Sequence, residues 1–307
     1  MLALPRHIWR AVTVVRVFAR HGAILFVDDL PVPWWLRRLL HRLNNDAAPG
    51  RPGERLALAL IELGPVYVKL GQTLATRADL LSQQVAEDLA TLHDDLPPFA
   101  GTEAVRSVEA DLGVPLGQLF LAFEREPIAA ASIAQVHRAS TTDGRDVAVK
   151  VLRPGIERRV RSELRFFAFG AFLAEHLLPL SDRLQPEEAV RVFTVTTLRE
   201  LDMRMEAAAC DEFGENNKDG DKFRVPRVDW QRTGKHTLTI EWITGIASDE
   251  PELLLAIGVD PAEVLETASR VFFQHVFVHG FFHGDMHPGN IFIQPDGTII
   301  PVDYGIM

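Results

Sequence analysis

The feature that most constrains this chain of 307 residues is an ordered set of carboxylate and amide side chains near its end. Segment 283–290 reads His-Gly-Asp-Met-His-Pro-Gly-Asn, which places Asn290 five residues after Asp285. Two short apolar runs, joined by the turn Pro-Asp-Gly, separate Asn290 from Asp303 and predict a β-hairpin. The hairpin would carry Asn290 at one end and Asp303 at the other. Such oxygen ligands suit Mg²⁺.

The same order of residues occurs in kinases. Their catalytic loop carries an Asp that faces the attacking hydroxyl and an Asn five residues later that binds a metal ion, and a later Asp holds the metal on ATP. Asp285 is therefore the candidate catalytic residue, and Asn290 and Asp303 are the candidate metal ligands. The stretch Val-Ala-Val-Lys ending at Lys150 matches the kinase V-A-I-K strand, whose Lys reaches the phosphates. The sequence thus predicts binding of ATP with Mg²⁺.

An alanine-rich loop stands where kinases carry G-x-G-x-x-G-x-V. Each glycine position is alanine, at Ala129, Ala131 and Ala134, and Val136 occupies the valine position. A Cβ makes close approach of backbone to phosphate costlier, so we expect a nucleotide pose different from that in protein kinases. The loop residues predicted to contact nucleotide are Ile128, Ala129, Ala130, Ala131, Ser132, Ile133, Ala134, Gln135 and Val136.

An acidic partner for Lys150 is expected on a helix at 199–209, because these residues favour helix. Asp202 and Glu206 are four apart and would share a face of that helix. We predict that Glu206 pairs with Lys150, since three small alanines follow Glu206 and permit close packing against a strand. The alternative is a solvated helix whose acids have no such role.

A strand expected at 237–243 supplies the remaining nucleotide contacts. In a kinase this strand enters the hinge between the lobes. Backbone groups from Glu241 to Ile243 would bind adenine there.

These motifs together resemble the UbiB family of atypical kinases, which is linked to ubiquinone biosynthesis. The family's marks are an alanine-rich loop, a K-x-G-Q motif in an N-terminal extension and an E-x-D motif. The K-x-G-Q motif reads here from Lys69 to Gln72, and E-x-D from Glu200 to Asp202. The resemblance implies a regulatory role for these residues. The helix of Lys69 would lie over the nucleotide cleft, where Lys69 and Gln72 would meet Glu200 and Asp202. It would thereby occlude the site at which protein kinases bind their peptide. From the residues alone, a solvent-facing polar stripe is the alternative.

The resemblance implies an α+β, protein-kinase-like fold of two lobes with a helical N-terminal extension. Bacterial members continue well past the segment at Asp303 and carry membrane-spanning segments, so we expect the second lobe here to be incomplete. We predict a helical extension at 1–115, a nucleotide-binding lobe with a helical insertion at 116–245 and a partial second lobe at 246–307.

Charge is unevenly distributed along the chain. The net charge of −10 argues against nucleic acid as a main partner. Residues 1–60, in contrast, contain nine Arg, no Lys and four acids. On a helical wheel Arg6, Arg10, Arg16 and Arg20 share one sector opposite a Val- and Phe-rich face, a pattern that suits an anionic membrane surface. A helix packed on the kinase body is the alternative. The resemblance implies peripheral attachment at the cytoplasmic face of the inner membrane, with ubiquinone-biosynthesis proteins or lipid precursors as partners.

Three functions are compatible with these residues. The first is an atypical kinase or ATPase of the UbiB type that supports ubiquinone biosynthesis. The second is a small-molecule kinase, since aminoglycoside and choline kinases share a similar H-G-D-x-x-x-x-N loop, although the alanine-rich loop and K-x-G-Q argue against it. The third is a nucleotide-binding pseudokinase scaffold, which would have no need of the complete set of Lys, Asp, Asn and Asp found here.

Overall fold

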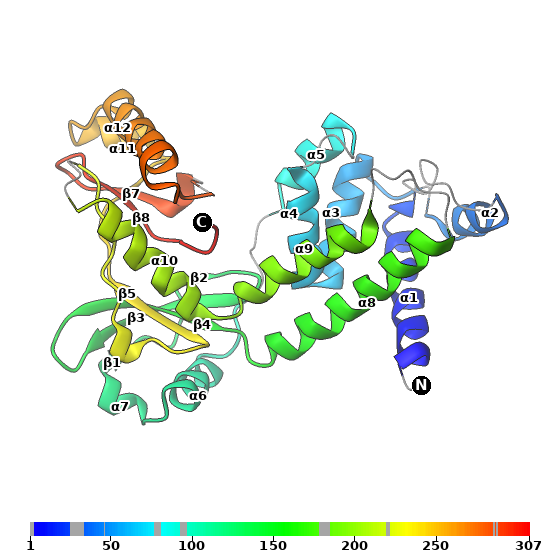
Figure 1. Ribbon diagram of the computed structural model, residues 1–307, viewed down its shortest axis with the longest axis horizontal. Helices are drawn as coiled ribbons and strands as arrows, with labels where there is room; N and C mark the ends of the chain where they lie inside the picture. Colours follow the sequence, from blue (N-terminus) through cyan, green and yellow to red (C-terminus); the bar gives the residue numbers. More distant parts are fainter. Residues whose placement is uncertain are drawn as a thin grey trace. The chain divides into compact units, whose positions relative to one another are not determined.

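The computed structural model describes residues 3–24, 34–45, 47–76, 81–92, 97–177, 185–218, 222–284, 286 and 288–307. The chain forms two compact units, each built from several stretches of sequence (Figure 1). The first, here called the helical unit, comprises Met1–Pro97, Ala131–Ile133 and Gly155–Leu198. The second, the mixed unit, comprises Pro98–Ala130, Ala134–Pro154 and Arg199–Met307.

The helical unit packs amphipathic helices around an apolar core that includes the fully buried Leu89. The corner between its third and fourth helices depends on Gly64, whose φ of 106° lies where L-residues are strained. A Cβ on Gly64 would also come within 2.3 Å of the Arg159 guanidinium. Pro65 then begins the next helix, because proline lacks the N–H that the first helical position leaves unpaired. The helices are α1 (Ala3–Arg20), α2 (Trp34–Leu43), α3 (Pro52–Leu63), α4 (Pro65–Ala75), α5 (Gln83–Ala90), α8 (Ile156–Leu177) and α9 (Pro186–Arg199).

Part of the arginine side of α1 contacts other helices of the helical unit, whereas Arg6 and Arg16 are exposed. Arg10 forms a two-point ion pair with Glu163 of α8, at 2.8 Å for each contact. The hydroxyl of Tyr67 on α4 donates to the same carboxylate at 3.1 Å. Arg20 pairs with an acid of α3, and Val17 on the apolar side is buried. Arg10 and Arg20 thus contact other helices of the same unit, and the predicted contact of this sector with a membrane stays a prediction.

The mixed unit is organised around an antiparallel sheet of order β1-β3-β4-β5, with β2 also paired to β3. Burial alternates along β4, where Val149 is fully buried and Lys150 is half-buried. The buried side packs against Val108 of α6, so α6 covers one face of the sheet and leaves Lys150 on the other (Figure 1). The strands are β1 (Phe120–Phe123), β2 (Ala129–Ala130), β3 (Ala134–Thr141), β4 (Asp146–Leu152) and β5 (Thr237–Glu241). The helices beside them are α6 (Gly101–Leu112), α7 (Leu116–Leu119) and α10 (Met203–Asn216).

A second sheet, of order β6-β7-β8, carries the end of the chain. Its β7 and β8 pair antiparallel across the Pro-Asp-Gly turn, which confirms the predicted hairpin. A π-helical turn, His275–His279, follows α12 and leads toward the catalytic-loop sequence. The elements are β6 (Ile246–Ala247), β7 (Ile291–Ile293), β8 (Ile299–Pro301), α11 (Pro251–Ala256) and α12 (Pro261–Gln274).

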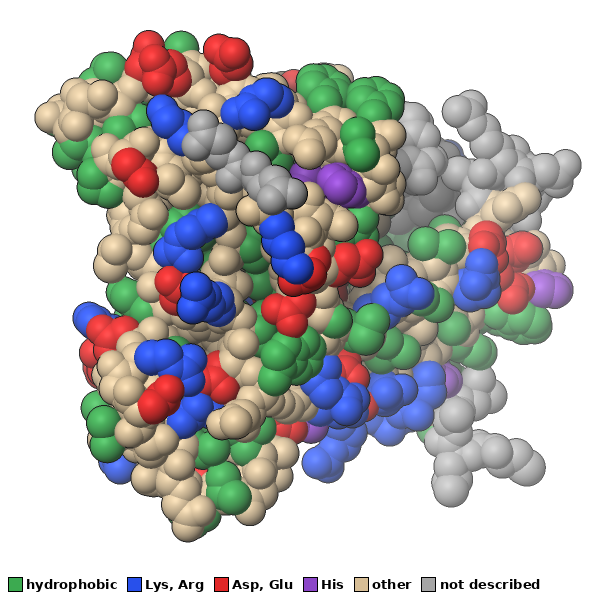
Figure 2. Space-filling model, turned by 60° about the vertical axis from the view of Figure 1, so that its left-hand side comes forward, with side chains coloured by type: hydrophobic (Ala, Val, Ile, Leu, Met, Phe, Trp, Pro, Cys, Tyr) green, Lys and Arg blue, Asp and Glu red, His purple; other side chains and the backbone are tan. Residues whose placement is uncertain are grey.

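The two units divide the chain differently from the three predicted regions. The helices α6 and α7 belong with the sheet, although the predicted boundary near residue 115 falls between them. The insertion made by α8 and most of α9 belongs with the helical unit instead of the nucleotide-binding lobe. Acidic and basic side chains lie interspersed over the mixed unit on the side that Figure 2 shows.

Candidate active site

Three predicted site residues meet within the mixed unit. The Nζ of Lys150, on β4, donates to both carboxylate oxygens of Glu206, on α10, at 2.8 and 3.0 Å. It also donates to Oδ2 of Asp303, just after β8, at 3.3 Å. The side chains of Lys150 and Glu206 are 20% and 7% exposed, whereas that of Asp303 is 42% exposed. The predicted Lys150–Glu206 pair is thus present, and the predicted metal ligand lies beside it with one side open to solvent.

Electrostatics keep this group charged. Burial alone would lower the pKa of Lys150, but the carboxylates of Asp303 and Glu206 raise it above its usual value. The Lys150 ammonium in turn holds the pKa of Asp303 below its usual range. Burial raises the pKa of Glu206, and the ammonium opposes that shift. At neutral pH the site therefore presents a lysine cation and an ionised Asp303, the forms needed to hold phosphates and a metal ion.

A break in the helix sets the position of Glu206. The helix expected at 199–209 is interrupted: α9 ends at Arg199 and α10 begins at Met203. Asp202 caps α10 by accepting a hydrogen bond from the backbone N–H of Arg204 at 3.2 Å. The expectation that Asp202 and Glu206 share a helix face is therefore wrong, because Asp202 precedes the helix. Glu206 consequently lies in the first turn of α10, where the helix dipole favours an acidic side chain.

The segment around Asp303 is fixed by His283 and Gly284, which immediately precede the candidate catalytic residue. The ring of His283, almost fully buried, donates from Nε2 to the carbonyl of Asp303. The N–H of Gly284 donates to the carbonyl of Ile306 at 2.8 Å. The N–H of Gly305 donates to Oδ1 of Asp303 at 2.9 Å, which leaves Oδ2 directed at the lysine. Asp285 itself lies outside the described residues, so its place is a prediction.

Gly284 occupies the position at which regulated protein kinases carry an arginine. A Cβ on Gly284 would come within 2.9 Å of the Ile306 side chain and 3.3 Å of its carbonyl oxygen. A larger side chain would therefore push the Asp303 segment aside. This close approach gives a packing reason for glycine beside the candidate catalytic residue.

Not every residue predicted to contact nucleotide in the alanine-rich loop is accessible. Gln135 is fully buried. Its Oε1 accepts from the N–H of Phe99 at 3.0 Å, and its Nε2 donates to the carbonyl of Phe99 at 3.3 Å. The Nε2 also hydrogen-bonds the ring of His137. Because the Gln135 side chain is buried and joins the segment before α6 to β3, the prediction that this side chain contacts nucleotide is corrected. Ile128, in contrast, is exposed.

The remaining loop residues differ in exposure. Ser132 and Ala134 are buried, whereas Ala129 is exposed and Ala130 is half-buried. Ala131, Ser132 and Ile133 are grouped with the helical unit. The nucleotide contact predicted for these residues stays a prediction.

The predicted hinge is partly occupied by hydrogen bonds of the protein itself. The N–H of Glu241 donates to the carbonyl of Arg227 at 2.9 Å, and the next N–H, of Trp242, donates to the carbonyl of Asp146 at 3.1 Å. These two N–H groups are therefore not donors to adenine. The predicted adenine contacts are narrowed to the backbone carbonyls of residues 241–243 and the N–H of Ile243.

The sequence interpretation did not include Ala148. In the register of β3 and β4, Val136 lies opposite Lys150 and Ala148 lies two residues before it on the same face of the sheet. Both apolar side chains are half-buried. The register puts these two side chains, here called the apolar shelf, on the face of the sheet that carries the lysine. The period-two alternation of β4, counted back from Lys150, was the signal that could have identified Ala148.

The K-x-G-Q helix, α4, is held tightly in the helical unit. Gln72 donates from Nε2 to the carbonyl of Leu92 at 3.3 Å. A Cβ on Gly71 would come within 2.5 Å of Leu92 and 2.7 Å of Leu60, so glycine here permits close packing against α3. Lys69 lies in this unit, whereas the E-x-D acids lie in the other. The implied contact of Lys69 and Gln72 with Glu200 and Asp202 stays a prediction.

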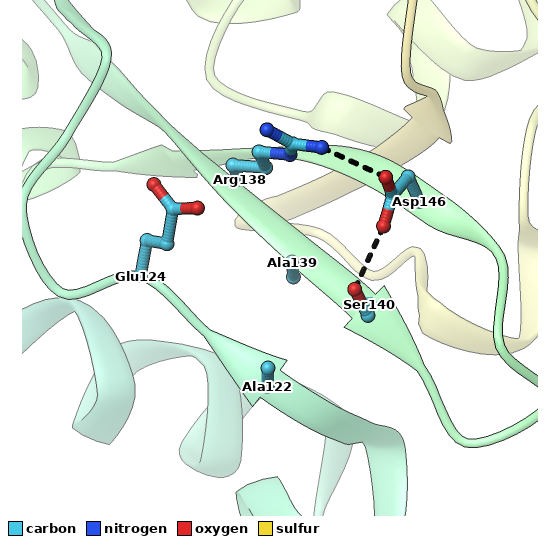
Figure 3. Close-up of a pocket in the computed structure, with 6 residues that line it drawn as sticks. All are labelled: Ala122, Glu124, Arg138, Ala139, Ser140 and Asp146. Atoms are coloured by element: carbon cyan, nitrogen blue, oxygen red, sulfur yellow. Dashed lines mark hydrogen bonds and ion pairs between the residues drawn. The ribbon is translucent and has the colours of Figure 1, made fainter.

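A depression of about 310 Å³ lies farther along the sheet face that carries Lys150 (Figure 3). Arg138 crosses it to pair with Asp146 at 2.8 Å, and Ser140 donates to the same carboxylate at 2.7 Å. Arg138, Ser140 and Asp146 thus satisfy one another, while the Glu124 side chain lies apart from these three (Figure 3). Its lining residues are Ala122, Glu124, Arg138, Ala139, Ser140 and Asp146.

Metal binding at the active site requires ligands besides the protein. Within the described residues, no group of three or more His, Cys, Asp or Glu side chains is placed to hold a metal ion. Mg²⁺ in kinases is usually bound by one or two carboxylates or amides together with substrate phosphates and water. Asp303 and Asn290, which flank the hairpin, match that smaller set. The carbonyl of Asn290 accepts from the N–H of Val302 at 2.9 Å, which holds the two ends of the hairpin together.

Comparison with known proteins places this geometry in a family. Residues 91–307 match the ABC1 atypical kinase-like domain. The chain belongs to this family. The predicted kinase-like α+β fold and the predicted relation to UbiB proteins are thereby confirmed.

Individual relatives agree with this assignment. Proteins named "Probable protein kinase UbiB" from Pseudomonas paraeruginosa and Marinobacter nauticus are each 39% identical over 97% of this chain. The chain spans 58% and 56% of their lengths. A solved structure of the Rv3197–erythromycin complex from Mycobacterium tuberculosis is 28% identical, with a TM-score of 0.56 over 89% of this chain and 63% of that one.

Proposed function

We propose that this protein is an atypical kinase or ATPase of the UbiB type that binds Mg-ATP in the mixed unit. The observation that carries the proposal is the placement of Lys150 between Glu206 and Asp303, with Asp303 partly open to solvent. A lysine cation held by a helix glutamate is the arrangement that kinases use to position ATP phosphates. The apolar shelf of Val136 and Ala148 beside it suits the adenine base.

The donor set fits Mg²⁺. Asp303 is ionised because the Lys150 ammonium lowers its pKa. Asn290, whose backbone pairs with Val302 at the same open end of the hairpin, would add an amide oxygen. Asp303 and Asn290 would hold the ion. When bound, Mg²⁺ neutralises charge on the phosphates. Lys150 would bind the phosphates, and Asp285 would orient or deprotonate the attacking group.

We further propose that this activity supports ubiquinone biosynthesis at the cytoplasmic face of the inner membrane, with proteins or lipid precursors of that synthesis as partners. The support is the 39% identity to proteins named UbiB. No helix among the described residues is long and apolar enough to cross a membrane. The proposal therefore assigns the described helices a peripheral contact only.

ATP hydrolysis tests the catalytic assignment. Wild-type protein should hydrolyse ATP in the presence of Mg²⁺, and anionic lipid with a phenolic quinone precursor should stimulate it. Asp285→Asn should retain nucleotide affinity but lose at least about 10²-fold in turnover, because it removes the carboxylate and keeps the shape. Unchanged turnover in this variant would remove Asp285 from the mechanism. Phosphoryl transfer to a soluble alcohol would favour the small-molecule kinase, and binding without turnover would favour the scaffold.

A further inference from the structure

The helix α2 presents an unusual surface for its length. Its ten residues read Trp-Trp-Leu-Arg-Arg-Leu-Leu-His-Arg-Leu and contain no acid. Four large apolar side chains are exposed: Trp34 at 76%, Trp35 at 57%, Leu39 at 49% and Leu43 at 53%. Single exposed apolar residues are common on soluble proteins, but four in ten residues, with two tryptophans, indicate a contact surface.

The basic residues of α2 lie among these apolar side chains. At 100° per residue, Trp35, Arg38, Leu39 and Arg42 fall within about 100° of one another. Arg38 and Arg42 are exposed, as are Trp35 and Leu39. One outward face therefore combines tryptophan, leucine and arginine. On α1, in contrast, Arg10 faces inward to its partner on α8.

This face is presented by a helix whose C-terminal end is fixed. The residues after α2 bond to the end of α1: the N–H of Asn45 donates to the carbonyl of Ala19 at 2.8 Å, and its side-chain amide donates to the carbonyl of Arg20 at 3.2 Å. Asn44 accepts from the N–H of Ile24 at 3.2 Å. In Figure 1, α2 lies at the margin of the helical unit, beside the end of α1. The exposed side chains are thus carried by the unit and do not belong to a loose tail.

We propose that α2 docks in the plane of a membrane that contains anionic lipid. Tryptophan and leucine enter the boundary between headgroups and acyl chains, while Arg38 and Arg42 bind the anionic headgroups. Ten helical residues extend only about 15 Å, so α2 lies along the surface instead of crossing it. The proposal places in α2 a membrane contact of the kind that the proposed function requires.

A lipid surface fits α2 better than a protein partner does. A stable protein interface needs about 800 Å² from each partner. One exposed face of a three-turn helix supplies only a fraction of that area. A membrane sets no such minimum, because each inserted tryptophan and each paired arginine adds affinity separately. Charge complementarity between the acid-free helix and anionic lipid supplies the specificity.

Vesicle flotation tests the proposal on the whole chain. Wild-type protein should float with phosphatidylcholine vesicles that contain phosphatidylglycerol, bind pure phosphatidylcholine at least about tenfold more weakly, and lose affinity as salt rises. Trp34→Gln with Trp35→Gln should reduce binding at every salt concentration. Arg38→Gln with Arg42→Gln should abolish the preference for anionic lipid, since each arginine contributes about fivefold.

The matched control is Phe172→Gln with Leu177→Gln on α8, whose side chains are 48% and 72% exposed in the same unit. This control should float like wild type. Equal flotation of the tryptophan variant and wild type, or equal loss in the α8 control, would overturn the assignment to α2. A thermal shift with Mg-ATP, measured on the same samples, separates the two proposals. Folded α2 variants should keep that shift, whereas loss of the shift in wild type would count against the nucleotide site only.

Discussion

The ion pair between Lys150 and Glu206 gives the most direct prediction about stability. Glu206→Gln keeps the side-chain shape but replaces one of two acceptor oxygens, at 2.8 and 3.0 Å from the ammonium, with an amide that donates. Removing one partner of a buried pair costs about 3–5 kcal/mol, and one charged hydrogen bond is worth about 1.5–3 kcal/mol. Because Asp303 stays 3.3 Å from the lysine and Gln still accepts one bond, we expect a loss of about 1.5–3 kcal/mol.

Urea unfolding followed by circular dichroism at pH 7 measures this loss. The matched control is Glu215→Gln on the same helix, where an exposed glutamate pairs with Lys218 and should matter by less than about 1 kcal/mol. Glu206→Gln should also weaken Mg-ATP binding about tenfold or more, since an unanchored lysine meets the phosphates less often in the right position. If Glu206→Gln were as stable as the control and bound Mg-ATP as tightly as wild type, the pair would have neither role.

Three further outcomes follow from particular residues. Ala131→Gly should change the ratio of the ATP and ADP dissociation constants in calorimetry, because glycine frees the loop backbone; an unchanged ratio removes the loop's role. Ala148→Met should fill the apolar shelf and therefore weaken ATP binding, measured by fluorescence titration, while the melting temperature stays that of wild type. Equal ATP affinity in variant and wild type would refute a role of the shelf in binding. Burial lowers the pKa of His275, so the unfolded state binds the extra proton and stability is lost as pH falls below 6.5. His275→Phe should therefore flatten the curve of unfolding free energy against pH, measured by urea unfolding between pH 7 and 5, by up to about 1.4 kcal/mol per pH unit.

The sequence predicted those parts of the site that local pattern determines. The Pro-Asp-Gly turn between two apolar runs was sufficient for the β7–β8 hairpin, and the strand motif before Lys150 indicated its need for an acidic partner. These features depend on neighbours in the chain, or on one pairing that the motif itself requires.

Other features depend on partners that lie far apart in sequence. A helical wheel showed that α1 is amphipathic, but not that Arg10 meets Glu163, which is 153 residues away. Helix propensity across 199–209 concealed the cap at Asp202, because the residues on both sides of it favour helix. Gln135 belongs to a loop motif, yet its burial is set by the backbone of a distant segment. In each case tertiary contact overrode the local pattern.

Calorimetric titration of ATP in the presence and absence of Mg²⁺, on wild type and Asp303→Asn, tests the central claim most directly. Asp303 is the ionised group beside Lys150 that remains open to solvent. Wild-type protein should bind ATP more tightly with Mg²⁺ than without it. Asp303→Asn should lose that enhancement, about tenfold or more in affinity, while its circular dichroism spectrum stays that of wild type. An enhancement by Mg²⁺ that persists unchanged in Asp303→Asn would contradict the account.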